Sequence, residues 1–192
     1  MQTLKNAPPV KTSSTGTGYT SHHGNNEHNA NLEIPRQIPL GHGKFALVDA
    51  VDYGWLSQYK WHAHRGKTNK TDYAIRDGWT PDGRRTTFKM HREILGFPPA
   101  RVDHRDTNGL NCQRRNLREA NKSQNGANRG KNSNNTSGYK GVSWHKAARK
   151  WSAQIQVRGK YTYLGLFPNP EVAHAAYAEA AAHYFGEFAR SA

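Results

Sequence analysis

A polar segment between Gly130 and Gly138 limits the fold of this chain more than any other sequence feature. Its inner residues are one lysine followed only by Asn, Ser and Thr. Such residues bury no apolar surface and favour turns and extended connections. We therefore predict that residues 131–137 are a linker. The 192-residue chain then divides into a longer part, residues 34–130, and a shorter part, residues 138–192.

Residues 1–33 precede both parts and differ from them in composition. They are mostly Ser, Thr, Gly, Asn and His, with few large apolar side chains. A segment of this kind cannot bury enough apolar surface to offset the entropy that is lost on folding. We expect a disordered polar tail, with the folded chain beginning near Ile34.

The longer part is predicted to be rich in short strands. Asp52 is a predicted helix cap, for a helix over residues 52–59. Apolar and β-branched residues between turn signals predict strands in four places: residues 44–48, 61–64, 73–76 and 86–90.

The end of the longer part combines a turn with a capped helix. Asp106 to Gly109 is expected to form a turn between two short extended segments. Asn121 is followed three residues later by Gln124, the spacing of a capping box. This pair predicts a helix over residues 122–129.

The shorter part predicts three strands and then one helix. Residues 151–157 alternate apolar with polar side chains, which is typical of a strand with one buried face. Further strands are expected at residues 142–145 and 161–167. Asn169 followed by Pro170 predicts the start of a helix that covers the apolar face. The fold class is therefore α+β, with a β-rich longer part beside a three-stranded antiparallel sheet packed on one helix.

Positive charge is the strongest signal in the composition. Lys and Arg outnumber Asp and Glu by 28 to 14, and the isoelectric point is near 10.1. No acidic residue occurs from Lys140 to Tyr163. Because basic surfaces attract polyanions, we expect nucleic acid as the partner. A basic surface that only improves solubility is the alternative, and the uneven placement of the charge argues against it.

Cysteine usage and hydropathy indicate the compartment. Cys112 is the single cysteine, so no internal disulfide can form, as suits a reducing cytoplasm. No apolar run approaches the ~18–20 residues of a membrane helix, and the N-terminus lacks the apolar region of a secretion signal. We expect a cytoplasmic protein with no membrane partner and no organic cofactor.

A group of polar residues near several arginines offers a carboxylate, an imidazole and two carboxamides. These residues are Asp103, His104, Asn116 and Asn125. A hard divalent cation prefers oxygen ligands, and a neutral imidazole can accept a proton from an attacking water. Asp103 and His104 would point to opposite faces of an extended strand, so we expect a kink that brings them together. Asn116 is expected to bond across the loop and fix the imidazole. A polar loop without chemistry is the alternative.

This stretch resembles the HNH nucleases, in particular the homing-endonuclease branch with a ββα-metal site, over about residues 88–129. The resemblance implies that His104 is the general base, that Asp103 and Asn125 are metal ligands, and that Asn116 rigidifies the loop. Asn125 stands where the family often has His, which suits Mg²⁺ or Mn²⁺ and disfavours a tight zinc site. The matching motifs are Asp103-His104-x-Asp106-x-Asn108, Asn116-Leu117 and Gln124-Asn125-x-x-Asn128. The implied phosphate contacts are Arg105, Arg114, Arg115, Arg118, Lys122 and Arg129.

About residues 138–189 resemble the plant ethylene-response-factor (Apetala-type) DNA-binding domain. The matching motifs are Gly138-Tyr139-Lys140-Gly141-Val142, Lys150-Trp151-x-Ala153-x-Ile155 and Tyr163-Leu164-Gly165-x-Phe167. The resemblance implies that the exposed face of the sheet enters the DNA major groove. The implied contacts are Lys140, Ser143, Trp144, Lys146, Gln154, Gln156, Arg158, Tyr161 and Tyr163.

Several of these positions depart from the plant pattern. Ser143, Gln154, Gln156 and Tyr161 stand where charged residues are usual, so the plant target sequence does not transfer. Glutamine can still read an adenine edge through two hydrogen bonds. Trp144 and Tyr163 have two open interpretations, stacking on the DNA backbone or packing within the sheet.

Together these features predict a metal-dependent DNA endonuclease of homing type. A flexible linker is expected to tether it to the DNA-binding sheet and so to raise the local DNA concentration. Because one site cuts one strand, a monomer or weak dimer on DNA should nick the duplex and leave 3′-hydroxyl and 5′-phosphate ends. Two alternatives stay open: a non-catalytic DNA-binding regulator with a decayed site, and a protein that binds or cleaves RNA.

Overall fold

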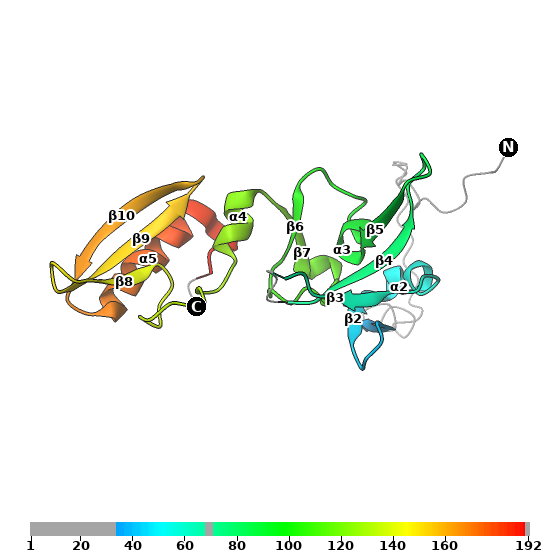
Figure 1. The fold of residues 1–192 in the computed structure, drawn as a ribbon, viewed down its shortest axis with the longest axis horizontal. Coiled ribbons are helices and arrows are strands. Elements are labelled where there is room, and N and C mark those ends of the chain that lie inside the picture. The colour runs from blue at the N-terminus through cyan, green and yellow to red at the C-terminus, as the bar shows by residue number, and fades with distance from the viewer. Residues whose placement is uncertain (1–33, 68–70, 191–192) are drawn as a thin grey trace, which may run out of the picture.

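The computed structural model describes residues 34–67 and 71–190 (Figure 1). The predicted polar tail, residues 1–33, lies outside this part of the chain. Among the described residues, four α-helices and four small antiparallel sheets form two units, which lie on either side of helix α4 in Figure 1. The α+β class is confirmed. We refer to residues 34–130 as the N-terminal unit and to residues 138–190 as the C-terminal unit.

The N-terminal unit begins with a two-stranded sheet and a short helix. Strand β1 (Arg36–Pro39) pairs with β2 (Phe45–Val48), and α2 (Ala50–Leu56) follows. The predicted cap at Asp52 was wrong, because the helix begins earlier and Asp49 holds the N-cap position. Asp52 is instead buried inside the helix, where its carboxylate accepts two hydrogen bonds from Arg114.

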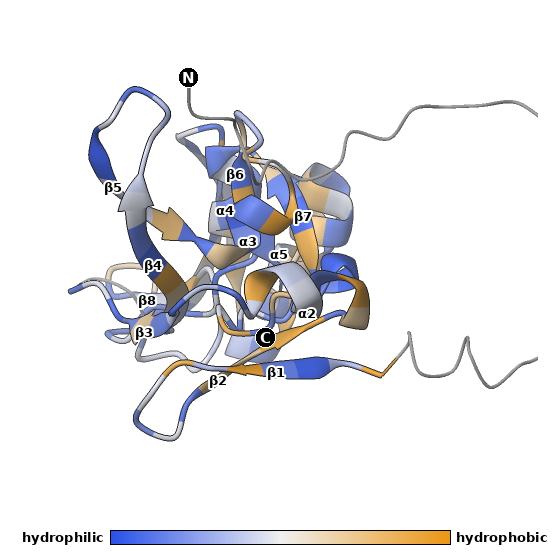
Figure 2. Ribbon diagram, turned by 90° about the vertical axis from the view of Figure 1, so that its right-hand side faces the viewer, coloured by the Kyte–Doolittle hydropathy of each residue, from blue (hydrophilic) through white to orange (hydrophobic). Residues whose placement is uncertain are grey.

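A three-stranded sheet follows, made of β3 (His62–His64), β4 (Tyr73–Trp79) and β5 (Arg85–Lys89). The hairpin of β4 and β5 extends away from the rest of the unit (Figure 2). Helix α3 (Met90–Ile94) continues directly from β5. Its apolar side chains join the core of the unit, whose most buried large members are Ile38, Val48, Leu56 and Met90.

The last elements of the N-terminal unit form a ββα arrangement. Strand β6 (Arg101–His104) pairs with β7 (Leu117–Ala120), which follows the 3₁₀ turn η1 (Arg114–Asn116). Helix α4 (Lys122–Ala127) comes next. The predicted capping box is confirmed, since the side chain of Asn121 accepts from the Gln124 amide and the Gln124 side chain accepts from the Asn121 amide. The helix ends two residues before the predicted residue 129.

The C-terminal unit is a three-stranded antiparallel sheet covered by one helix, as predicted. Strands β8 (Val142–His145) and β10 (Lys160–Phe167) flank the central β9 (Lys150–Val157). Helix α5 (Pro170–Phe185) packs on all three, and the 3₁₀ turn η2 (Gly186–Phe188) follows. No helix in the described part of the chain is long and apolar enough to cross a membrane.

Close packing between the sheet and α5 explains one glycine of this unit. Gly141 has a φ of +74°, and a Cβ there would lie 2.1 Å from a ring carbon of Tyr177. Only glycine accepts both the left-handed backbone and this approach at no steric cost. The aromatic ring of α5 can therefore lie directly on the backbone that leads into β8.

The two units are not loosely tethered, contrary to the expectation from the linker's composition. Ala120 and Ala127 of the N-terminal unit are buried in one apolar cluster with Ile155, Tyr177 and Phe185 of the C-terminal unit. The linker residues also bond to the sheet that follows, because the Ser137 hydroxyl donates to the Val142 carbonyl at 2.8 Å. Composition alone could not show this, since the contacts that join the units lie outside the linker.

Candidate functional site

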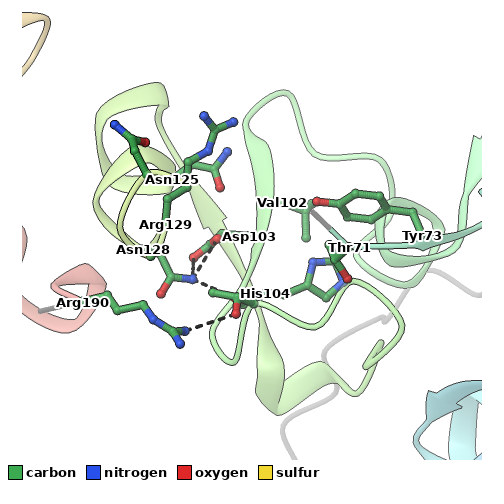
Figure 3. Close-up of a pocket in the computed structure, with 12 residues that line it drawn as sticks. Thr71, Tyr73, Val102, Asp103, His104, Asn125, Asn128, Arg129 and Arg190 are labelled. Atoms are coloured by element: carbon green, nitrogen blue, oxygen red, sulfur yellow. Dashed lines mark hydrogen bonds between the residues drawn. The ribbon is translucent and has the colours of Figure 1, made fainter. Parts of the chain in front are cut away.

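A pocket of about 390 Å³ opens beside the end of β6, next to α4 and the last described residues of the chain (Figure 3). Asp103, His104 and Asn125 line it, so the structure brings together three of the four predicted site residues. Arg129 and Arg190 also line it and make its surroundings basic. Asn116, the fourth predicted residue, lies outside the pocket wall.

The Asp103 carboxylate is buried and held from two sides. Arg118, its partner in the β6–β7 register, donates from Nε to Oδ2 at 2.9 Å. The Asn128 amide donates to Oδ1 at 3.1 Å and to Oδ2 at 3.0 Å. Both Asp103 and Arg118 have side chains only 6% and 7% exposed. A buried charge needs such a partner, because desolvation strongly disfavours an isolated carboxylate.

His104 presents a neutral imidazole with one unused nitrogen. Its Nε2 is buried and has no hydrogen-bond partner among the described residues. Burial lowers the pKa of His104 to about 4, although the nearby Asp106 and Asp103 carboxylates act in the opposite direction. At neutral pH the ring is therefore uncharged and able to accept a proton.

Two aromatic residues hold the His104 ring in place. The His91 and His104 rings meet edge to face with centroids 4.9 Å apart, and Tyr73 packs against both rings. Burial, together with the His104 ring, lowers the pKa of His91 to about 3. His91 thus packs against the predicted base as a second buried neutral imidazole.

The predicted kink between Asp103 and His104 was wrong. Both residues belong to β6 and pair in regular register with Arg118 and Leu117. Figure 3 shows the carboxylate on the side of Asn128 and the imidazole on the side of Tyr73. The two side chains nevertheless line one pocket.

Asn116 closes the loop between β6 and β7, but it does not fix the imidazole. Its Oδ1 accepts from the Asp106 amide at 3.0 Å, and its Nδ2 donates to the Asp106 carboxylate at 3.0 Å and to the Asn111 carbonyl at 2.7 Å. No hydrogen bond joins Asn116 to His104 among the described residues. Its role is therefore to rigidify the loop that follows His104.

Asn128 is a site residue whose part sequence reasoning missed. Besides holding Asp103, its Nδ2 donates to the His104 carbonyl at 2.7 Å. Asn125 lines the same pocket, but forms no hydrogen bond to Asp103. The available signal was helical spacing, since Asn128 lies three residues after Asn125 and so on the same side of α4.

The donors in this pocket fit a hard divalent cation by their chemistry. No group of three or more His, Cys, Asp or Glu side chains that could hold a metal occurs in the described part of the chain. A site made of one carboxylate and carboxamide oxygens contains only one such side chain and is therefore not covered by that finding. Asp103 Oδ1 accepts only the Asn128 bond, and a carboxylate oxygen has two lone pairs. One ligand position on Asp103 therefore remains, as suits an ion that keeps most of its waters.

The basic residues of the N-terminal unit that are predicted to contact phosphate divide into two groups. Arg118 is corrected to a structural residue, because its buried guanidinium is shared between Asp103 and the Glu187 carbonyl. Arg114 donates twice to the buried Asp52 at 2.7 Å, so most of its charge is also used within the fold. Arg114 stays exposed despite this pair. The other exposed members are Arg105, which pairs with Glu187, together with Arg115, Lys122 and Arg129.

Lys140 is likewise corrected from a DNA contact to a structural residue. Its ammonium group donates to the carbonyl oxygens of Ala127, Arg129 and Arg190, the last two at 2.7 and 3.0 Å. These bonds use all three of its donors. Burial lowers the pKa of Lys140 to about 8. The side chain thus fastens the end of α4 to the C-terminal residues.

The outer face of the C-terminal sheet carries most of the other predicted contacts. Gln154 and Gln156 lie directly opposite Tyr163 and Tyr161, so these four side chains share one exposed face. Ser143, Lys146 and Arg158 are also exposed. Trp144 lies opposite Trp151 in register and packs against its ring on the face of the sheet toward α5, and it stays 46% exposed. The ring contact supports packing within the sheet, one of its two interpretations.

A groove of about 880 Å³ connects the pocket with this sheet. The groove and the pocket have Asn125, Arg129, Gly130 and Asn132 in common, and the groove continues to Gln154, Gln156 and Tyr161. No acidic residue lines it. Its basic lining residues are Arg101, Lys122, Arg129, Lys131, Lys140 and Arg158. Sequence reasoning missed Arg101 and Lys131, since neither belongs to a motif.

Comparison with known proteins adds no family. No family model matches the chain, and no curated protein matches it.

Proposed function

We propose that this protein is a metal-dependent endonuclease that hydrolyses phosphodiester bonds in duplex DNA. The observation that carries the proposal is the pocket, where a buried neutral imidazole with a free Nε2 lies beside a carboxylate and opens into a basic groove. These are the groups that a phosphodiester hydrolase needs: a base, an oxygen ligand for a cation, and positive charge for the phosphates.

His104 is the proposed general base. Its Nε2 would accept a proton from the water that attacks phosphorus. A pKa of about 4 makes the free imidazole a weak base, but a phosphodiester anion in the pocket would favour the protonated ring and so raise that pKa. The packing of His91 and Tyr73 against the ring limits its rotation, so the base needs little reorganisation on binding substrate.

Asp103 and Asn125 are the residues that would hold the cation, with Mg²⁺ most compatible and Mn²⁺ also suited to oxygen donors. When bound, such a cation stabilises the charge that develops on the leaving 3′ oxygen. Arg129 lies at the junction of pocket and groove, where it is placed to bind a phosphate next to the scissile one. The products would be 3′-hydroxyl and 5′-phosphate ends.

The C-terminal sheet is the proposed recognition surface for duplex DNA. Gln154 and Gln156 are exposed beside the half-buried Ser152 and can donate to and accept from base edges. Tyr161 and Tyr163 add two side chains that are 69% and 62% exposed. Because one such site cuts one strand, we expect a nick rather than a double-strand break, with a monomer or weak dimer on DNA.

Supercoiled plasmid incubated with Mg²⁺ or Mn²⁺ tests the proposal. We expect conversion to nicked circles, loss of nicking with EDTA, and loss of nicking but retention of binding in His104→Ala. Gln58→Ala, an exposed substitution far from the pocket in sequence, is the control. Failure of the wild-type protein to nick at any metal concentration would reject the nuclease.

One observation favours a second function, a DNA-binding regulator without catalysis. Asp103 is already paired with Arg118 and Asn128, and a carboxylate so paired binds a cation less readily. DNA binding that is unaffected by metals and by His104→Ala, with no nicking, would support this alternative. Competition between duplex DNA and structured RNA at one salt concentration separates DNA from RNA as the partner.

A further inference from the structure

The last described residues of the chain lie against the β6–β7 hairpin and its loop. The Glu187 carboxylate pairs with Arg105, and the Glu187 carbonyl accepts from Arg118 Nη1 at 2.8 Å. Arg190 donates to the Thr107 hydroxyl at 3.2 Å and lines the pocket. These contacts join residues that are 69 to 83 positions apart in the sequence.

Arg118 connects the two units through a single side chain. One edge of its guanidinium binds the buried Asp103, and another nitrogen binds the backbone of η2. The Phe188 ring covers the guanidinium, with Cζ 3.7 Å from the ring centroid. Such cation–π contacts are worth most when they are desolvated, as they are here because Arg118 and Phe188 are both buried.

Apolar packing strengthens the same interface. Ala120 and Ala127 pack with Ile155, Tyr177 and Phe188 in a cluster that contains residues of both units. Lys140 ties the end of α4 to the Arg190 carbonyl. The interface thus combines a shared apolar core with a buried cation, which is the composition of a fixed contact rather than a transient one.

We infer that the two units act on DNA as one rigid body, so that the cut falls at a fixed distance from the sequence bound by the sheet. This inference rests on the proposed function and goes beyond it, because it assigns the junction groove as the path of the DNA backbone between recognition and cleavage. The groove supports it, since its lining contains no acidic residue and includes Gln156, Arg158 and Arg129, of which Arg129 also lines the pocket.

A flexible tether predicts a different pattern of cuts. A free linker of the length of residues 131–137 spans roughly 15 Å on average. Since successive phosphates of one strand are about 3.4 Å apart along the axis, cuts would scatter over about four base pairs and would scatter further as the linker lengthened. Rigid docking predicts one dominant position that does not depend on linker length.

Cut-site mapping on a selected target decides between the two patterns. Four Gly/Ser residues inserted between the exposed Ser133 and Asn134 should leave the cut position unchanged. Phe188→Ala with Glu187→Ala should broaden the cuts while the footprint of the sheet stays the same. Val172→Ala, an exposed apolar residue at the start of α5, is the matched control and should change neither. Cuts that spread in the insertion variant, or that stay sharp in the interface variant, would overturn the inference.

A distance measurement separates failure of this inference from failure of the proposed function. Spin labels on Lys60→Cys and Lys160→Cys report the separation of the units without DNA, and the buried Cys112 will not react. We expect one narrow distance distribution in the parent and in the insertion variant, and a broad one in Phe188→Ala with Glu187→Ala. A broad distribution in the parent refutes the rigid body whether or not the protein cuts. If the distance distribution is narrow but the protein does not nick DNA, the proposed nuclease and the fixed distance between cut and bound sequence are both refuted. Only the rigid contact between the two units then stands.

Discussion

The two units use positive charge in different ways. In the N-terminal unit, Arg76, Arg114 and Arg118 each bind a buried carboxylate and so stabilise the fold. In the C-terminal unit, Lys146 and Arg158 are exposed and have no ion pair within the described part of the chain. Some cations of either unit thus serve structure, as Lys140 does in the C-terminal unit, whereas exposed ones remain available to an external anion. Net charge alone does not identify a binding surface, because a cation that is paired inside the fold is not free to bind phosphate.

Arg118→Met is the variant for which we expect the largest effect. Removing one partner of a buried pair leaves Asp103 uncompensated, so we expect a loss of about 3–5 kcal/mol in the free energy of unfolding, measured in urea. Arg84→Met is the control, because its ion pair with Asp82 is exposed and solvent-exposed pairs contribute little to stability. Adding Asp103→Asn to Arg118→Met should restore part of the loss. Equal losses for Arg84→Met and Arg118→Met would contradict the assignment.

Acid should destabilise the N-terminal unit through its two buried histidines. The pKa values of His91 and His104 are lowered from 6.5 to about 3 and about 4. Between these values and 6.5 the unfolded chain binds more protons, so stability is full above pH 6.5 and falls as the pH decreases toward 4. Each histidine accounts for on the order of 3 kcal/mol of the unfolding free energy that is lost over this pH range.

His91→Phe is the matching variant for this window. We expect its unfolding free energy to decrease less between pH 7 and pH 4 than that of the wild type, because one of the two groups no longer takes up a proton on unfolding. Hydrogen exchange in each unit would show whether the acid effect begins around β6. Identical pH profiles for the variant and the wild type would exclude the buried histidine as the cause.

Lys140 and Lys146 test the comparison within the C-terminal unit. Lys140→Met removes three hydrogen bonds from a charged donor, so we expect a loss of roughly 2 kcal/mol in stability. Lys146→Met should change stability by less than about 0.5 kcal/mol, but should weaken DNA binding and reduce its dependence on salt. Thermal unfolding and a salt titration of binding give both values. The reverse pattern would restore Lys140 as a DNA contact.

The smallest expected effect is on base recognition by the sheet. Gln154→Ala should weaken binding to a selected target by about 1 kcal/mol and leave non-specific binding unchanged, as measured by fluorescence anisotropy. Trp144→Ala should instead lower stability, because its ring packs on Trp151. If Trp144→Ala weakened specific binding at unchanged stability, its assignment to the covered face would be wrong.

Local signals predicted much of the fold. The alternation in residues 151–157, the Asn169-Pro170 helix start and the Asn121 capping box all appear in the structure as expected. Each depends on neighbours within a few residues, so the sequence contains the whole cause. Asp52 shows the limit of this reasoning, since a residue suited to a helix cap is instead buried against Arg114, 62 positions away.

The candidate site was predicted in its residue types but not in its contacts. The sequence placed Asp103, His104 and Asn125 near each other, and the pocket contains all three. It did not show that Asn128 would hold Asp103. Nor did it show that the side chains of Arg118 and Lys140 would form hydrogen bonds within the protein. Those roles depend on which surfaces meet, and a residue's type does not reveal whether an internal or an external partner will satisfy it.

The sequence by itself therefore determined the secondary structure of the C-terminal unit, the division of the chain into two parts, the excess of positive charge and the chemistry available around Asp103. Only the tertiary structure decided that the two units share a core at Phe188, that Arg118 joins them beside the pocket, and that a basic groove connects pocket and sheet. The physical reason is the distance along the sequence over which each interaction acts. Capping and alternation act between near neighbours, whereas burial and ion pairing depend on segments that only folding brings together.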